Sequence, residues 1–401
     1  MVSDLTSFDA TSSFVGYLYQ VRYALLLALK KIDDVDDPDN CFISIEKLDD
    51  VAFEESGTPS ELLQMKHHTK AGNITDRSQD IWKTVRVWSE FVATSNEFES
   101  AVFSLVTTEV AAESTIAEFL SCDKGKRNPG LALERMRSIS QETKSETNKK
   151  AYEAFCSLEP WQQNKLVSSI YIIGSSPSIV DIRHLLLKKL RSAVFADYVD
   201  PFLTRLEGKW FSRIIDIFCS SDEDVICLSE VLVVMDDLRN QFLPSNLPAD
   251  FSDAIPTNID LDGDARRFLE QLRLIGANNR VLTTAVINFY RAYEQRSRWS
   301  KDNLLRPGEI KKYLDRLKDE WENYYGLLEM EYDFSQEQQM VNFGTKLYSK
   351  CQLEAVIPIR AEFSEPYVAR GSYNTLADDL AIGWHPDYQS HCGSGKSEGV
   401  A

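Results

Sequence analysis

The sequence lacks the motifs of several common enzyme classes. It contains no GxxxxGK[ST] loop for nucleotide phosphates, no GxGxxG turn for dinucleotides and no GxSxG nucleophile motif. Its five histidines include no HExxH pair, and its seven cysteines are scattered singly with no CxxC pair. These absences argue against an ATPase, a dinucleotide-dependent enzyme, a zinc ribbon and a disulfide framework, so we expect reduced thiols.

Long apolar runs are missing as well. No stretch approaches the roughly 20 apolar residues needed to cross a bilayer. Residues 1–13 are acidic and polar, without the basic and then apolar pattern of a secretion signal. We therefore expect a cytoplasmic protein with no membrane partner. With 401 residues, of which 43% are hydrophobic and 26% charged, the chain has the composition of a globular protein with more than one domain.

Positive charge is scarce, since 44 lysines and arginines face 62 acidic residues and the net charge is −18. This balance argues against a protein whose whole surface attracts nucleic acid, because phosphate affinity comes from concentrated cations. Any contact with DNA must be local to one basic strip, or arise in a groove shared between subunits. The candidate cations are Lys83 and Arg86 on one helix face, and Lys124, Lys126 and Arg127 in a loop. A solvated face with ion pairs and a plain exposed loop are the alternatives.

The hydrophobic pattern predicts an α+β protein. An α/β domain over 1–150 is expected to contain a helix at 14–31, strands at 41–45, 61–68 and 101–107, and a helix at 82–92. A mostly helical regulatory or assembly domain follows over 151–335, and a C-terminal extension with a flexible tail over 336–401. The helices expected in the 151–335 domain are 182–195, 201–218, 228–239, 265–274, 279–296 and 309–328. A short strand at 169–173 is expected to return to the first sheet.

The segment 43–68 carries the residues that point to chemistry. If 42–50 is one extended strand, side-chain alternation places Glu46 and Asp50 on one face and Asp49 on the other. On the returning strand, Gln64 and Lys66 share a face. A hairpin would then gather Glu46, Asp50, Gln64 and Lys66 on one surface, unless a bulge shifts the register.

Two carboxylates, an amide oxygen and an ammonium group suit phosphodiester hydrolysis. Mg²⁺, or Mn²⁺ in its place, prefers oxygen ligands, so Asp50 is the strongest metal-ligand candidate, with Glu46 and Gln64 in support. Such an ion polarises the phosphoryl oxygen and activates a water molecule. Lys66 beside the ion would offset charge in the transition state or help to position and deprotonate the water.

These residues resemble the restriction-endonuclease-like superfamily. The element carried by Asp50 and Gln64-Met65-Lys66 is similar to its (D/E/Q)xK arrangement, with a neutral glutamine in place of the usual second carboxylate. Four longer strings resemble the N-terminal double-stranded-DNA endonuclease domain of antiphage effectors from Lamassu and ABC three-component systems and from cyclic-oligonucleotide-activated systems. They are GYLYQVRYALLLAL, IEKLDDV, LLQMKHH and TDRSQDIWKTVRVW, beginning at residues 16, 45, 62 and 75.

The resemblance covers about the first quarter of the chain and implies a function. It implies a nuclease fold, with Gln20 of the first helix also facing the site. Because the second half looks helical and not like a nucleotide sensor, it favours the Lamassu or ABC three-component branch. That branch implies an SMC-like ATPase and a small third protein as partners, and a nuclease that is held inactive until it oligomerises. Because a break in double-stranded DNA needs two sites of opposite polarity, a dimer or tetramer is the expected active form. The rival hypothesis is a nuclease-like subunit that has lost activity and serves as an adaptor.

Overall fold

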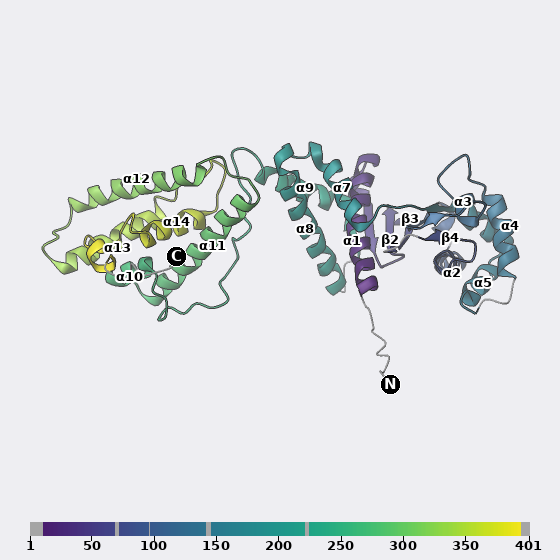
Figure 1. Ribbon diagram of the computed structural model, residues 1–401, viewed down its shortest axis with the longest axis horizontal. Coiled ribbons are helices and arrows are strands. Elements are labelled where there is room, and N and C mark those ends of the chain that lie inside the picture. Colours follow the sequence, from purple (N-terminus) through teal and green to yellow (C-terminus); the bar gives the residue numbers. More distant parts are fainter. Residues whose placement is uncertain (1–10, 69–71, 96, 142–145, 221–223, 394–401) are drawn as a thin grey trace, which may run out of the picture. The chain divides into compact units, whose positions relative to one another are not determined.

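A six-stranded mixed sheet lies at the centre of the first part of the chain. The computed structural model describes residues 11–68, 72–95, 97–141, 146–220 and 224–393, and the chain divides into two units, Met1–Leu238 and Arg239–Ala401 (Figure 1). The sheet order is β7-β5-β3-β2-β1-β8. Its strands are β1 (Cys41–Ile45), β2 (Val51–Glu55), β3 (Thr58–Lys66), β5 (Val102–Thr107), β7 (Ile170–Ile173) and β8 (Ile226–Cys227). The predicted strands at 41–45 and 101–107, and the return of 169–173 to the sheet, are confirmed.

Strand direction changes within the sheet. β1, β2 and β3 are antiparallel neighbours, whereas β5 pairs in parallel with both β3 and β7. Ser56 and Gly57 connect β2 to β3 and both have positive φ, 50° and 79°, which is the backbone that a two-residue hairpin turn requires. The strand predicted at 61–68 therefore begins earlier, at Thr58, and ends at Lys66. A separate parallel pair is formed by β4 (Asn73–Ile74) and β6 (Val110–Ala111).

Helices cover both faces of the sheet. Lys31 of α1 (Thr11–Asp34) reaches Glu61 and lies over the ring of Phe53, so α1 covers the face that carries those residues. The opposite face packs against α2 (Gln79–Thr94), with Ala52 and Leu62 in one buried cluster with tryptophans of α2. Further helices of the first unit are α3 (Ile116–Phe119), α4 (Pro129–Ser140), α5 (Lys149–Cys156), α6 (Pro160–Ser169), α7 (Ile179–Lys189), α8 (Val199–Cys219) and α9 (Leu228–Gln241), the last of which crosses the unit boundary.

The two units divide the chain at a different place from the boundaries expected near 150 and 335. The expectation followed the change from alternating to helical pattern, but β7 pairs with β5, and α7 and α8 pack on α1. These contacts place the residues up to Leu238 with the sheet. The six predicted helices are confirmed, four of them as α7, α8, α9 and α12 (Glu309–Glu329) and two as α10 (Arg267–Leu274) and α11 (Asn279–Lys301). Among the described residues, no helix is both long and apolar enough to span a membrane.

The second unit is built around two helices in close contact. α14 (Pro366–Asp378) packs along α11, and α10, α12 and α13 (Glu337–Leu353) also pack against it. A Cβ added to Gly371 of α14 would lie 2.0 Å from the carbonyl oxygen of Asn288, so the two backbones approach as closely as glycine allows. The segment expected as an extension from 336 onward thus contains core helices of this unit. The flexible tail was predicted for the last ten residues, and from residue 394 onward it lies outside the described residues.

Candidate functional site

The loop between β1 and β2 replaces the long strand expected at 42–50, and that expectation is wrong. β1 ends at Ile45, which pairs with Val51, so the chain reverses between them. The backbone N–H of Glu46 donates to the carbonyl oxygen of Asp50 at 3.2 Å and closes the loop. Glu46 has a φ of 60°, a conformation that costs a non-glycine residue about 1 kcal/mol or more. Side-chain alternation therefore does not decide which carboxylates meet.

Asp49 is buried at the centre of the site. Its side chain accepts hydrogen bonds from the indole Nε1 of Trp88 at 2.6 Å, from the amide of Gln64, and from the backbone N–H of Asp50 at 2.9 Å. The residue is 6% exposed. Burial raises its pKa to about 6, although the hydrogen bonds from Trp88 and Gln64 act in the opposite direction. Asp49 is thus enclosed between the sheet and α2, away from solvent.

Asp50 lies beside Asp49 but reaches the partly open side of the site. One carboxylate oxygen accepts from Gln64 Nε2 at 3.0 Å, and the other accepts from the backbone N–H of Met65 at 2.7 Å. Lys66 Nζ lies 3.6 Å from the second oxygen. The structure therefore brings together three of the predicted residues, Asp50, Gln64 and Lys66, although the strand that carries Asp50 was predicted wrongly.

The side-chain amide of Gln64 has only one workable orientation. Carboxylates only accept hydrogen bonds, so its NH₂ group must face Asp49 and Asp50. Its oxygen is then left for Lys66, whose Nζ donates to Oε1 at 2.8 Å. Gln64 was expected to offer this oxygen to a metal ion, but in this arrangement the oxygen holds the ammonium group. Gln64 acts here as the link between the two aspartates and Lys66.

Glu46 and Gln20 complete the predicted set. Gln20 of α1 hydrogen-bonds through its side chain to the carboxylate of Glu46. Desolvation raises the pKa of Glu46, and the negative charge of Asp50 raises it further. Gln20 is 9% exposed, and its Oε1 is buried without a hydrogen-bond partner in the described part of the chain. A buried, unpaired oxygen on a side chain that contacts a carboxylate is a position that a cation would satisfy.

The predicted DNA-contacting cations are in different situations. Lys83 is exposed on α2, and Arg86, one turn later, lies 3.7 Å from Glu90. Lys124 is exposed, whereas Lys126 forms an ion pair with Glu118 at 2.9 Å. These four side chains can still meet a phosphate, because exposed ion pairs are weak.

Arg127 is used by the fold instead. Its guanidinium group donates to the carbonyl oxygens of Leu120, Ile170 and Ser168 at 3.1, 2.8 and 2.8 Å. It also stacks over the ring of Tyr171 at 3.8 Å. Arg127 therefore ties its loop to the edge strand β7, a role that the basic composition of the loop did not reveal.

Two other residues near the site were not predicted to act there. Trp88 ends the string that begins at residue 75, and no local pattern distinguishes it from the other apolar residues of its helix. His68 Nε2 lies 2.6 Å from a carboxylate oxygen of Asp80. His68, Asp80 and Glu109 together have ligand atoms within 4.8 Å of one another. His67, on the opposite side of the strand end, packs against the ring of Tyr19 at 4.8 Å.

Comparison with known proteins concerns the second unit. Residues 268–392 match the family model for C-terminal domain 7 of the ABC-three component (ABC-3C) systems. The matched residues run from α10 to α15 (Tyr388–Cys392) and include the close pair of α11 and α14. No curated protein matches the chain. The chain thus carries a domain of the ABC-3C systems at its C-terminal end, and a domain of a multi-component system indicates protein partners.

Proposed function

We propose that the first unit is a Mg²⁺-dependent DNA endonuclease of the restriction-endonuclease-like class, with Mn²⁺ as a substitute ion. The observation that carries this proposal is the arrangement of Asp50, Gln64 and Lys66. An ammonium group is held 3.6 Å from a carboxylate and is bound to the amide between them, at the end of one strand. This is the set of groups that a phosphodiester-cleaving site needs on one surface.

The oxygen atoms around this arrangement fit a hard divalent ion. Asp50 and Glu46 would supply carboxylate ligands, and the unpaired Oε1 of Gln20 would supply an amide oxygen. When bound, the ion supplies a Lewis acid for the phosphoryl oxygen and a water molecule with a lowered pKa. Gln64 supports the site through Lys66 and is not needed as a ligand.

The protein's own residues then have distinct tasks. Lys66 keeps its ammonium group at the position fixed by Gln64 and Asp50, where it can offset charge on the phosphate. Asp49 and Trp88 hold Gln64 from the buried side, so that its oxygen stays directed to Lys66. Lys83 and Arg86 on α2 would contact the DNA backbone outside the site.

We further propose that the protein is the nuclease subunit of a bacterial antiphage system of the ABC three-component or Lamassu kind. The domain match at 268–392 supports the part of this proposal that concerns an ABC three-component system. In this proposal an SMC-like ATPase and a small third subunit keep the nuclease subunits separate from one another until they are released. Cutting both strands requires two sites of opposite polarity, so a dimer or tetramer would be the active form. The net charge of −18 disfavours association without a trigger.

Plasmid cleavage by the full-length chain, alone and with its co-purified partners, tests the proposal. We expect cleavage with Mg²⁺ or Mn²⁺, none with EDTA, and none after Lys66→Ala. Lys165→Ala removes an exposed lysine of α6 that has no part in the proposed site or DNA contact, and it serves as the control, with activity close to wild type. Double-strand cutting should rise more steeply than linearly with protein concentration. If partner-activated protein never cuts, or Lys66→Ala cuts normally, the adaptor hypothesis replaces the enzyme.

A further inference from the structure

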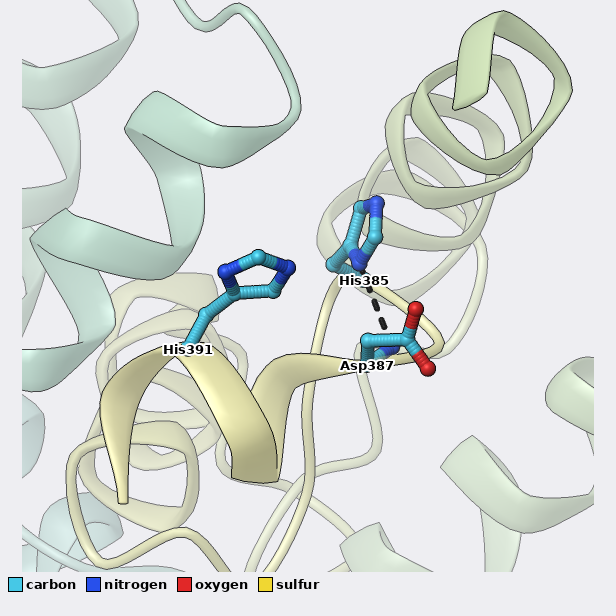
Figure 2. A group of neighbouring side chains, drawn as sticks. All are labelled: His385, Asp387 and His391. Carbon is cyan, nitrogen blue, oxygen red and sulfur yellow. Dashed lines mark hydrogen bonds between the residues drawn. The ribbon is translucent and has the colours of Figure 1, made fainter. Parts of the chain in front are cut away.

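A second group of ligating side chains lies in the other unit, at its C-terminal end. His385 and Asp387 are in the turn that precedes α15, and His391 is within α15 (Figure 2). One nitrogen of each histidine and one carboxylate oxygen of Asp387 lie within 4.8 Å of one another. The two imidazole rings are 5.6 Å apart and nearly perpendicular, at 85°, so they are not stacked on each other. Neither the proposed nuclease site nor the domain match accounts for this group.

His385 has the surroundings of a metal-bound histidine. It is 1% exposed, and its Nδ1 accepts the backbone N–H of Asp387 at 3.1 Å, the dashed line in Figure 2. The ring proton of the neutral form is therefore on Nε2, which is buried and has no hydrogen-bond partner among the described residues. A carboxylate oxygen of Glu337 lies 3.6 Å from Nε2. Metal-bound histidines donate their second N–H to a carboxylate, and Glu337 would need to approach by only about 0.6 Å to accept it from Nε2.

The protonation state of His385 also suits ligation. Burial lowers its pKa, and this effect outweighs the opposite effect of Glu337 and Asp387. The neighbouring His391 acts in the same direction as burial. Burial thus favours the unprotonated imidazole, which is the form that binds a metal.

We propose that His385, Asp387 and His391 bind one transition-metal ion of the zinc class, which fastens α15 to the buried turn at His385. Two imidazoles favour Zn²⁺ and similar ions over Mg²⁺, which prefers oxygen ligands. Ligands of a tetrahedral zinc ion lie about 2.0–2.2 Å from the metal, and so about 3.4 Å from one another. The ligand atoms, which lie within 4.8 Å of one another, must therefore approach by about 1.4 Å at most.

Exposure of two of the ligands permits this contraction. Asp387 and His391 are exposed and can rotate, whereas His385 is fixed by burial. The Nδ1 lone pair of His385 would bind the ion, and His385 would then lose the hydrogen bond that this atom accepts from the backbone N–H of Asp387. Three protein ligands leave a fourth position for water.

Zinc binding by the full-length chain tests this site. The protein is stripped with EDTA, dialysed, and titrated with ZnCl₂ against a chromophoric chelator, and in parallel with CoCl₂ to record the visible spectrum of the bound ion. We expect one zinc equivalent per chain at this site, and an affinity loss of more than about tenfold in His391→Ala and Asp387→Asn. Both residues are exposed, so these variants should fold, which circular dichroism checks.

Two histidine variants serve as controls. His184→Ala removes an exposed histidine elsewhere, and His68→Ala removes the histidine of the group that also contains Asp80 and Glu109. Both should keep the zinc affinity and cobalt spectrum of the wild type. The proposal is overturned if the wild type binds no zinc, if His391→Ala binds as tightly as wild type, or if His68→Ala alone removes binding.

Discussion

Replacing Trp88 with phenylalanine removes one atom group on which the site depends, the indole N–H that donates to Asp49 at 2.6 Å. Trp88 is 1% exposed and Asp49 is 6% exposed, so no solvent replaces the lost donor. A hydrogen bond to a charged group contributes about 1.5–3 kcal/mol. The smaller ring also leaves a gap, for about 1 kcal/mol more. We expect Trp88→Phe to lower the free energy of unfolding of the first unit by about 2–4 kcal/mol.

Hydrogen exchange read by mass spectrometry localises this effect, because it measures the opening of β3 and α2 separately from the second unit. Trp161→Phe is the matched control, since Trp161 is 56% exposed and its change should stay within about 0.5 kcal/mol. A double-mutant cycle of Trp88→Phe with Asp49→Asn should give a coupling of at least about 1 kcal/mol. A change below about 0.5 kcal/mol for Trp88→Phe, or no coupling, would refute the proposed role of Trp88 as a support of the site.

Four further outcomes are expected. Asp50→Asn should reduce Mg²⁺-dependent plasmid cleavage about a hundredfold while circular dichroism stays unchanged, and full activity would exclude Asp50 as a ligand. The pKa of Asp49 is about 6 in the folded state and about 3.9 in the unfolded state. Between these pH values the folded state therefore holds a proton on Asp49 that the unfolded state has lost. Urea unfolding in EDTA should show wild type losing stability relative to Asp49→Asn as pH rises from about 4 to 6, and a constant difference would contradict this. Gly371→Ala should destabilise the second unit by about 3 kcal/mol in thermal unfolding. Gly326→Ala should not destabilise it, because an added Cβ there meets open space. Equal losses of stability in the two variants would contradict the close approach of α11 and α14. Gln64→Glu should destabilise the first unit at pH 8 more than at pH 5.

Elements with a clear period were predictable from the sequence. In the helices α7 to α12, apolar residues repeat about every 3.6 positions. β1 and β5 are short apolar runs bounded by turn residues. α14 escaped prediction because most of its residues are buried, among them Gly371, Ser372 and Asn374. A helix that is covered all round has no polar face, so its sequence carries no amphipathic period.

The grouping of Asp50, Gln64 and Lys66 was predictable from the sequence, but its geometry was not. Asp50, Gln64 and Lys66 were selected from their residue types and spacing, and the structure brings them together. The assumed strand at 42–50 failed because four of the five residues at 46–50 are charged, and such a segment fits a loop as well as an exposed strand face. The roles of Asp49 and Trp88 depend on a contact between residues 39 positions apart, which no local pattern records.

The neutral residue at position 64, where the (D/E/Q)xK pattern usually has a carboxylate, follows from its neighbours in the structure. Asp49 and Asp50 both direct oxygens at it, and the two N–H groups of an amide supply one donor for each. A glutamate would place a third negative charge there and supply no donor at pH 8, so we expect Gln64→Glu to cost at least about 2 kcal/mol in EDTA. Toward pH 5 the added carboxyl takes up a proton and part of the loss should return. Gln338→Glu, at an exposed position of α13, should show neither effect. If Gln64→Glu were as stable as wild type at pH 8, the two aspartates would not face this residue, and the argument for the orientation of Lys66 would fail with them.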